Sequence, residues 1–297
     1  MKSVVLKGGL GNQLFQLATF FMLRNTQNFK DIKLDCSSGF ILDLKYNRNL
    51  EIFKDSKNKY SCSNFQSKLN ILVLIINKFF PKLLKIFPIL IISDENFDQL
   101  NNLCSLQNKF ILFDGYFQNS KIVNNVFPKV NSISKELLGL KSTIKFENLY
   151  EEIKEQRNSV ALCVRFYEEA NSALSHTNTN KGIKSYSEFN KVVRHFEQNL
   201  EKPFFFIFVQ NENKFTKRLI INSPHKFITH SKGFNGSWQR LKAQSFCKHH
   251  IFNNSTFYYW GAKFSSYYYK DEEFLSLKYV SDNFLYEEIY QKDWKLF

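Results

Sequence analysis

The sequence lacks the cysteine and leader patterns that mark secreted or zinc-binding proteins. Its cysteines, at positions 36, 62, 104, 163 and 247, form no CxxC pair and no zinc-like spacing. We therefore expect free thiols in a reducing compartment. The chain opens with a strand-like run rather than a charged n-region and an apolar h-region. We expect no signal peptide and a cytoplasmic protein.

Acidic residues are scarce, with 27 Asp and Glu against 41 Lys and Arg and a formal net charge of +14. Such a charge suits an anionic partner: a nucleotide phosphate, a nucleic acid or an acidic membrane surface. The chain has no block of consecutive basic residues and no RNA-binding signature. This disfavours nucleic acid as a partner.

No hydrophobic run is long enough to span a membrane. The most apolar stretch, Leu69–Ile92, is interrupted by Asn77, three lysines and two prolines, and its pieces are too short for ~30 Å of hydrocarbon. Two interpretations stay open. The stretch forms core helices separated by proline breaks, or it forms an apolar, lysine-bearing surface that docks on anionic lipid. The second would attach the protein peripherally to the inner face of the cytoplasmic membrane.

Strand-like apolar runs recur along the chain and alternate with helical stretches such as 186–200 and 238–246. This alternation predicts an α/β protein with parallel sheets. The polar segment that ends KEQRNS is the best domain boundary, so we predict one domain over 1–157 and a second over 158–297. The expected strands are SVVLKG, DIKLD, LIIS, FILFDGYF, SVALCVRF, PFFFIFVQ, HKFITH and HHIFNNS.

A glycine cluster joins the first expected strand to the first expected helix. Apolar residues 4–6 predict the strand, and apolar residues at helical spacing follow from Leu14. Gly8, Gly9 and Gly11 lie between them, where the backbone turns tightly or closely approaches a ligand. The segment is either an ordinary βα turn or a place for a phosphate or a sugar.

The same segment only partly matches the dinucleotide-binding fingerprint. Leu14 stands where that fingerprint has its third glycine. Asp35 does follow at about the distance of a ribose-binding acid. A nicotinamide enzyme therefore remains an alternative.

Two later segments carry residues suited to phosphate. Arg165 follows a strand near its carboxyl end, where a guanidinium can hold two phosphate oxygens or form a salt bridge. In HHIFNNSTFYYWGAKF, Ser255 and Thr256 are natural N-caps whose hydroxyls, with free backbone N–H groups, form an anion site. The aromatic run 257–260 predicts either core packing or a surface that stacks a base.

Four segments occur in the same order as in one known family: GGLGNQLFQ, FDGYFQNSKIV, the strand ending CVRF, and SFCKHHIFNNSTFYYWGA. From Lys7 to about Trp294, the chain resembles the bacterial α-1,2-fucosyltransferases of glycosyltransferase family 11. The resemblance implies a GT-B fold, in which two Rossmann-like domains face each other across a cleft. Residues 1–157 would then form the acceptor side and residues 158–297 the donor side.

The resemblance also implies an activity. It is the inverting transfer of L-fucose from GDP-fucose to a galactoside hydroxyl, in an α-1,2 linkage, during synthesis of surface polysaccharide (O-antigen). The donor is a substrate, and neither a cofactor nor a metal is implied; the sequence contains no DxD motif. The implied partners are the nucleotide sugar and a glycan acceptor, which can be lipid-linked, and not nucleic acid.

The family's site residues map onto this chain one by one. Arg165 would hold the leaving β-phosphate, and Asn12 would lie near the fucose. Glu168 is by position the first candidate for the base, and the alternative is that it is a solvent-facing loop carboxylate. His176, on a polar loop, is a weaker candidate for the base. The residues expected to bind the donor are Gly11, Arg165, Asn254, Ser255, Thr256 and Phe257.

The chain departs from the family at several of these places. Cys163 replaces a histidine and Phe166 replaces a second arginine. Carboxylates usual in the family are replaced at Gln210 or Asn211 and at Gln239 or Arg240, which matters because a carboxylate suits the N–H donors of guanine. Two alternatives stay open: a glycosyltransferase of the same fold with another nucleotide sugar, and a catalytically silent protein that binds a glycan or a nucleotide.

Overall fold

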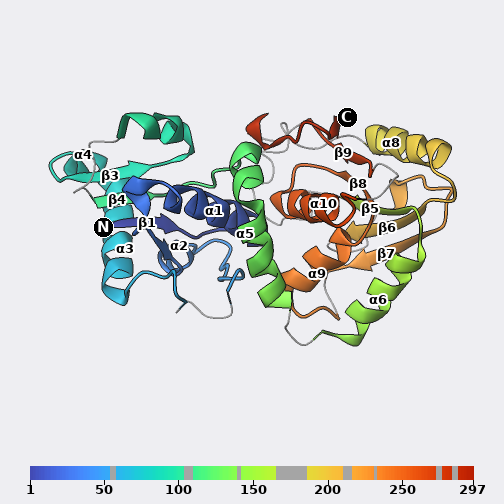
Figure 1. Cartoon of the computed structure of the whole chain (residues 1–297), viewed down its shortest axis with the longest axis horizontal. Helices are drawn as coiled ribbons and strands as arrows, with labels where there is room; N and C mark the ends of the chain where they lie inside the picture. Colours follow the sequence, from blue (N-terminus) through green and yellow to red (C-terminus); the bar gives the residue numbers. More distant parts are fainter. Residues whose placement is uncertain are drawn as a thin grey trace. The chain divides into compact units, whose positions relative to one another are not determined.

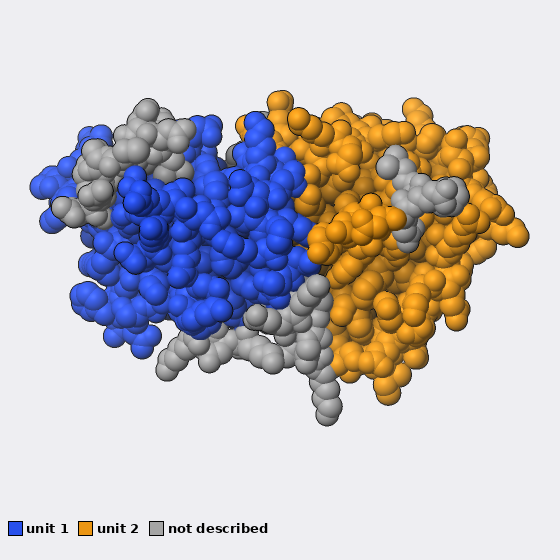
Figure 2. Space-filling model, viewed as in Figure 1, with its two compact units in different colours: residues 1–137 blue, residues 138–297 orange. Residues whose placement is uncertain are grey.

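The computed structural model describes residues 1–53, 58–103, 110–138, 142–164, 186–209, 216–230, 233–271, 276–282 and 287–297. They form two compact units, 1–137 and 138–297, which are coloured separately in Figure 2. The division lies at Leu137 rather than at residue 157, because helix α6 (Ile144–Glu155) packs against helix α9 (Gly236–Ser245) of the second unit. The rings of Tyr150 and Phe246 lie 4.5 Å apart at this contact.

The first unit contains a four-stranded parallel sheet (Figure 1). Its strands are β1 (Lys2–Val5), β2 (Lys33–Asp35), β3 (Ile89–Ile92) and β4 (Phe110–Phe113), in the order β2-β1-β4-β3. Val4 pairs with Phe113, so β1 and β4 end side by side. The helices are α1 (Leu10–Arg24), α2 (Ser38–Ile41), α3 (Asn64–Phe79), α4 (Pro81–Leu84) and α5 (Ser120–Leu138).

Helices α3 and α4 cover one face of this sheet. Val73 of α3 and Leu84 of α4 pack with Val5 and Leu112 from the central strands. Proline starts α4 at its first helical position, where a missing N–H costs nothing. The chain then returns through β3 to the edge of the sheet.

Asp35, at the end of β2, is a structural residue. It is fully buried, and its carboxylate accepts hydrogen bonds from the backbone N–H groups of Ser37 and Ser38, at 3.1 and 3.0 Å. The amide of Asn70 on α3 also donates to Asp35, at 2.6 Å. A carboxylate occupied in this way cannot bind a ribose, which removes the main support for a nicotinamide enzyme.

The second unit contains a six-stranded parallel sheet in the order β10-β9-β8-β5-β6-β7. Cys163 pairs with both Phe252 and Phe208, so the three central strands end together. The strands are β5 (Ser159–Cys163), β6 (Phe204–Val209), β7 (His225–Thr229), β8 (His249–Phe252), β9 (Lys278–Val280) and β10 (Lys295–Leu296). The remaining helices are α8 (Tyr186–Asn199) and α10 (Thr256–Tyr268).

Helices cover both faces of this second sheet. Phe189, Val193 and Phe196 of α8 pack with alternate residues of β5 and β6, such as Leu162 and Ile207. Helices α9 and α10 lie side by side (Figure 1). Gly261 permits this contact, because a Cβ there would come within 2.6 Å of Gln244 Cδ on the neighbouring helix segment. A parallel sheet buried on both sides explains why its strands are almost uniformly apolar.

The predicted α/β class and all eight expected strands are confirmed. Strands β9 and β10 were not expected, since three and two residues are too short for a recognisable alternation. The interpretation of Leu69–Ile92 as core helices is confirmed only in part, because the stretch packs on the core with one side and exposes the other. Within α3 only Gln66, Asn70 and Val73 are buried, and in α4 only Leu84.

Candidate functional site

In each sheet the order of the strands reverses beside the first strand of the unit. β1 lies between β2 and β4, and β5 lies between β6 and β8. Ligands of open parallel sheets bind outside the carboxyl ends of the strands at such a reversal. We therefore name two candidate regions. The first edge comprises residues 6–12 and 114–118, after β1 and β4; the second edge comprises residues 253–257, after β8.

The backbone of the first edge is shaped by a buried glutamine. Gly8 has a positive φ of 76°, which a glycine adopts without strain. The side chain of Gln13 is fully buried, and its amide donates to the carbonyl groups of Gly8 (2.8 Å) and Asn49 (2.9 Å). Its Oε1 accepts from the N–H of Glu51 at 2.8 Å. One side chain thus fixes the glycine turn against a distant loop.

A second buried glutamine joins the two loops of the first edge. Gln16 Oε1 accepts from the N–H of Lys7 (3.0 Å), and its amide donates to the carbonyl of Gly115 (3.0 Å). Lys7 and Asp114 form a salt bridge of 2.5 Å between the same loops. These partly exposed charges and the buried amide hold the ends of β1 and β4 in register.

Asn12 is the residue of this edge best placed to meet a ligand. Unlike Gln13 and Gln16, it is only half-buried. Its Oδ1 accepts from the amide of Gln118 at 3.2 Å, which fixes the side chain. Gly11 is buried in the first turn of α1. Sequence reasoning identified Asn12 but missed the glutamine clamps, because glutamine carries no signal of its own.

The second edge is built on the N-terminus of α10. Asn253 is buried and Asn254 half-buried after β8, and Ser255 is the N-cap of the helix. The hydroxyl of Ser255 makes no capping hydrogen bond. The first N–H groups of a helix have no partner within it and lie at the positive end of the helix dipole. Together with the hydroxyls of Ser255 and Thr256, they can bind an anion.

The aromatic run at the start of α10 divides into core and surface. Tyr258, Tyr259 and Trp260 are buried, with Trp260 fully inaccessible, so these three belong to the core. Phe257 is half-buried, and its ring lies 6.1 Å from the ring of His230, which follows β7. Phe257 is therefore the aromatic residue of the run that a ligand can reach.

Arg165, Glu168 and His176 lie outside the described residues, so their predicted roles stay predictions. Arg165 follows Val164 in the sequence, directly after β5. Cys163, at the position of the family's histidine, is fully buried and its thiol lies 3.2 Å from Gln244 Oε1. Burial raises the pKa of this thiol. Cys163 therefore packs in the core.

The expected positions for an acid on α9 carry no carboxylate and already have partners. Gln239 is buried, and its Oε1 accepts from the N–H of Asn235 (2.5 Å). The guanidinium of Arg240 donates to the carbonyl of His230 (3.1 Å) and to Ser237 Oγ (2.8 Å). Burial, followed by the charges of Arg240 and Lys145, lowers the pKa of His230 to about 4. His230 is thus neutral near pH 7, and sequence reasoning missed it at the end of an ordinary strand.

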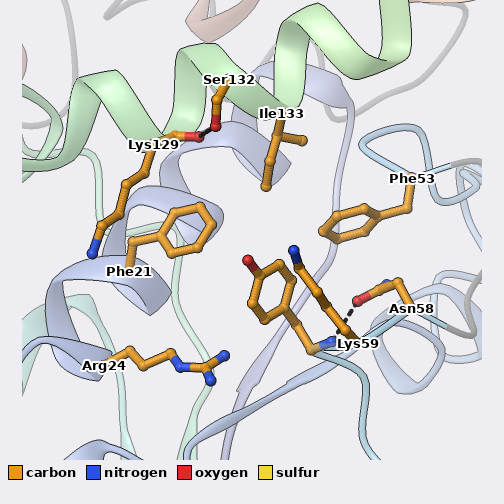
Figure 3. A pocket seen from close by; sticks show the side chains of 9 residues that line it. Phe21, Arg24, Phe53, Asn58, Lys59, Lys129, Ser132 and Ile133 are labelled. Carbon is orange, nitrogen blue, oxygen red and sulfur yellow. Dashed lines mark hydrogen bonds between the residues drawn. The ribbon is translucent and has the colours of Figure 1, made fainter.

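The first unit also contains a cationic pocket, shown in Figure 3. Of the nine residues that line the cavity of about 550 Å³, six are aromatic or basic, namely Phe21, Arg24, Phe53, Lys59, Tyr60 and Lys129. Arg24 lies twelve residues beyond Asn12 in the same helix, and at 1.5 Å per residue this is roughly 18 Å along its axis. The cationic pocket is therefore separate from the first edge.

Within the described ranges, no three His, Cys, Asp or Glu side chains gather as ligands of a metal ion. The cysteines at 36, 62, 163 and 247 are free thiols, as the sequence predicts. Neither edge offers a metal-binding cluster among these residues.

The proteins that the chain is similar to are named as glycosyltransferases. No family model matches the chain. The chain is similar to the O-antigen biosynthesis glycosyltransferase WbnK of Escherichia coli, with 24% identity over 279 residues, which are 86% of this chain and 88% of that protein. A structure of a family 9 glycosyl transferase from Veillonella parvula aligns with a TM-score of 0.43 and 11% identity, over 99% of this chain and 86% of that one. A TM-score of this size does not establish a shared fold. The similarity to WbnK is the stronger comparison, because it extends over most of both sequences.

Proposed function

We propose that this chain is a glycosyltransferase of O-antigen biosynthesis, of GT-B type, that uses no metal. Its proposed reaction is the inverting transfer of L-fucose from GDP-fucose to a galactoside hydroxyl, forming an α-1,2 linkage. The similarity to WbnK over 279 residues carries the coarser part of this proposal. The donor and the linkage rest on the four sequence segments shared with the α-1,2-fucosyltransferases.

The second edge supports a role in binding the donor. As the glycosidic bond of a nucleotide sugar breaks, negative charge grows on the leaving β-phosphate. The N-terminus of α10, with Ser255 and Thr256, presents oriented donors and a positive dipole end to such a charge. Arg165, which follows β5, would add a guanidinium that holds two phosphate oxygens. Phe257 would pack against the nucleoside or the sugar.

The first edge supports a role in positioning. Gln118 donates a hydrogen bond to the side chain of Asn12. The buried side chains of Gln13 and Gln16 fix the adjoining loops. We assign Asn12 to the fucose and the acceptor hydroxyl, which must meet in line for inversion. A base must take the proton of that hydroxyl, and Glu168 is our candidate.

One observation favours a second donor. Guanine is well matched by a carboxylate, yet Gln239 and Arg240 stand on α9 where the family has an acid. The buried Oε1 of Gln239 is already engaged with Asn235. Another nucleotide sugar is therefore the second candidate, and a silent nucleotide- or glycan-binding protein is the third.

Thermal unfolding with nucleoside diphosphates separates these candidates. A ligand at one hundred times its Kd stabilises the folded state by about 2.7 kcal/mol, so GDP should raise the Tm and UDP should not. The double variant Ser255→Ala/Thr256→Ala should remove most of the shift. Ser266→Ala, in the last turns of the same helix, should leave it intact.

Equal shifts with GDP and UDP would contradict the proposed donor, and no shift with any nucleotide would favour the silent protein. Release of GDP with a galactoside acceptor then tests catalysis directly. Activity should persist in EDTA. A strict requirement for manganese would show that the metal-free mechanism is wrong.

A further inference from the structure

Helices α3 and α4 and the turn after them expose many apolar side chains. Of 18 large hydrophobic residues exposed in the described part of the chain, eight lie within 23 consecutive positions. We call this set the apolar face; its members are Phe65, Leu72, Ile75, Phe79, Phe80, Leu83, Ile86 and Phe87. Monomeric soluble proteins rarely expose apolar side chains in such a concentration without a partner.

The exposure follows from the way α3 is anchored. Its buried side is partly polar, because Asn70 donates to Ser3 Oγ at 3.1 Å and to Asp35 at 2.6 Å in the core. The same orientation leaves Leu72 and Phe79 at 52% and 62% exposure. An ordinary surface helix turns its apolar stripe to the core. Helix α3 is instead apolar on both sides: Val73, Leu74 and Ile76 pack on the core, while Leu72, Ile75 and Phe79 remain exposed. The apolar face is therefore part of the fold.

The charges around the apolar face have a single sign. Lys68, Lys78, Lys82 and Lys85 are exposed among these residues, and no Asp or Glu occurs between Cys62 and Ser93. Among the described residues, none of these lysines forms a salt bridge with a carboxylate. Apolar side chains among lysines that have no carboxylate partner match a surface that is both apolar and negatively charged.

We propose that the apolar face docks the protein on a bilayer that contains anionic lipid. Its phenylalanine and aliphatic side chains enter the boundary between headgroups and acyl chains, while the lysines interact with anionic headgroups. No helix of the described residues is long and apolar enough to cross a membrane, so the contact is peripheral. A second copy of the chain is a poorer occupant, because a symmetric contact would bring the lysines of both copies together.

This inference extends the proposed function, since a lipid-linked acceptor would lie at the same surface. Its test needs no catalysis, so failure of the proposed function would leave the result interpretable. The full chain is sedimented with phosphatidylcholine vesicles, with and without phosphatidylglycerol. We expect binding only to the anionic vesicles, weakened by high salt.

Variants separate the apolar and the electrostatic parts. Lys78→Gln/Lys82→Gln/Lys85→Gln should lower partitioning roughly a hundredfold, since each lysine at an anionic surface contributes about a factor of five. Phe79→Ser/Phe80→Ser should abolish binding. The matched controls are exposed residues of the same unit outside the face: Lys30→Gln/Lys45→Gln/Lys121→Gln for the lysines and Leu44→Ser for the apolar residues.

Control variants that lower binding as much as the face variants would overturn the proposal, as would absence of binding to either vesicle. Light scattering adds a third outcome. If the wild-type chain is a dimer that Phe79→Ser/Phe80→Ser converts to a monomer, and vesicles are not bound, the apolar face joins two copies and the membrane proposal is wrong.

The cationic pocket carries a second, independent inference. Its three basic side chains, Arg24, Lys59 and Lys129, have no carboxylate partner among the described residues, and Lys129 donates to the amide oxygen of Asn25 at 2.6 Å. Arg24 lies over the ring of Tyr60, and its Nη1 is buried without a hydrogen-bond partner in the part of the chain described. Figure 3 shows this guanidinium directed toward the cavity. A buried donor without an acceptor is costly unless a ligand supplies one.

We infer that the cationic pocket binds a sugar that carries an anionic group, a carboxylate or a phosphate. Cations hold the anionic group, and the rings of Phe21, Phe53 and Tyr60 offer flat apolar surfaces for the ring of the sugar. A cavity of about 550 Å³ falls within the range of small-ligand sites. If the proposed function holds, this sugar is part of a charged acceptor.

Direct binding of three probes by NMR titration tests the site without donor or turnover. Glucuronic acid and glucose 1-phosphate distinguish the two anionic groups, and glucose is the neutral control. Arg24→Gln should weaken binding of the anionic probe at least about tenfold, the scale of a charge-assisted hydrogen bond. If Arg24→Gln does not fold, Lys129→Gln serves instead, with Lys121→Gln on the same helix as its control. Equal binding of glucose, or equal loss in the control, would overturn the inference.

Discussion

The two edges occupy the same place in their sheets but are built by different means. At the first edge, the buried side chains of Gln13 and Gln16 fix the glycine turn and join two loops. At the second edge, paired strand ends bring the chain to the N-cap Ser255, whose hydroxyl makes no capping bond. The first edge thus uses its polar groups to hold itself in position. At the second edge, the hydroxyl of Ser255 is not used to cap its own helix.

This contrast predicts that changes at the second edge affect the reaction and that changes to the buried glutamines of the first edge affect stability. The largest effect on the reaction should come from Arg165, which follows β5 in the sequence and is proposed to bind the same phosphate as the second edge. Arg165→Ala should lower kcat by roughly 10²–10³-fold, the scale of one lost donor to a transition-state charge. Arg165→Lys should also cost heavily, because the lysine keeps the charge but loses the two-pronged geometry. Steady-state kinetics and circular dichroism measure turnover and folding together.

Near-normal turnover of Arg165→Lys would mean that the phosphate is held elsewhere. Glu168→Gln is the companion variant. A comparable loss would support Glu168 as the base, whereas a mild loss would assign it to the solvent-exposed surface.

The next effect should come from Gln16 at the first edge. Gln16→Leu is similar in size but leaves the N–H of Lys7 and the carbonyl of Gly115 buried without their partner. At about 1–3 kcal/mol for each unsatisfied group, we expect about 2–4 kcal/mol of destabilisation in urea unfolding. Gln118→Leu is the control, since it removes only a half-buried bond to Asn12. Equal losses in both variants would contradict a special role for the buried clamp.

A smaller effect should separate two neighbouring glycines. Gly8→Ala places a Cβ 2.8 Å from Asn12 Nδ2 at a positive φ, which should cost about 1–2 kcal/mol and displace Asn12. Gly9, the N-cap of α1, has a negative φ and no atom within 4 Å of an added Cβ. Gly9→Ala should therefore be nearly neutral by thermal unfolding. A larger loss in Gly9→Ala would show that Gly9, rather than Gly8, makes the close contact.

The smallest effect per residue should come from mild acid, which should lower the stability of the second unit and leave that of the first unchanged. All six histidines lie in the second unit. Burial lowers the pKa of His230 to about 4 and of His249 to about 3. Below about pH 6.5 the histidines of the unfolded chain bind protons, whereas these two histidines of the folded chain stay neutral. The stability that they contribute to the folded state is therefore fully present above that pH and is lost as the pH falls below it.

Near pH 6 the loss should be roughly 1 kcal/mol for each buried histidine. Hydrogen exchange at pH 7.5 and pH 6 would measure it, after correction for the intrinsic exchange rates. Protection should fall in the second unit and stay constant in the first. His230→Asn should reduce the difference, whereas His225→Asn, on an exposed side chain, should not. Equal losses in both units would rule out the histidines as the cause.

The sequence by itself determined the α/β class, eight of the strands and the loops that carry Asn12 and Ser255. These follow from local rules, because apolar runs, glycine turns and N-caps act over a few residues. It also located Phe257, although the choice between core and surface for the aromatic run stayed open. The burial of Tyr259 and Trp260 decided that choice.

Only the tertiary structure decided the rest, because the partners are distant in sequence. Asp35 fits a ribose-binding spacing, yet contacts with Ser38 and Asn70 make it a buried anchor. Leu69–Ile92 has the composition of a core segment, but only one side of it meets the core, where Asn70 bonds to Ser3 and Val73 packs, and its phenylalanines remain exposed. Composition reports how apolar a residue is. Which side of a helix meets the core depends on the few polar groups that must find their partners there.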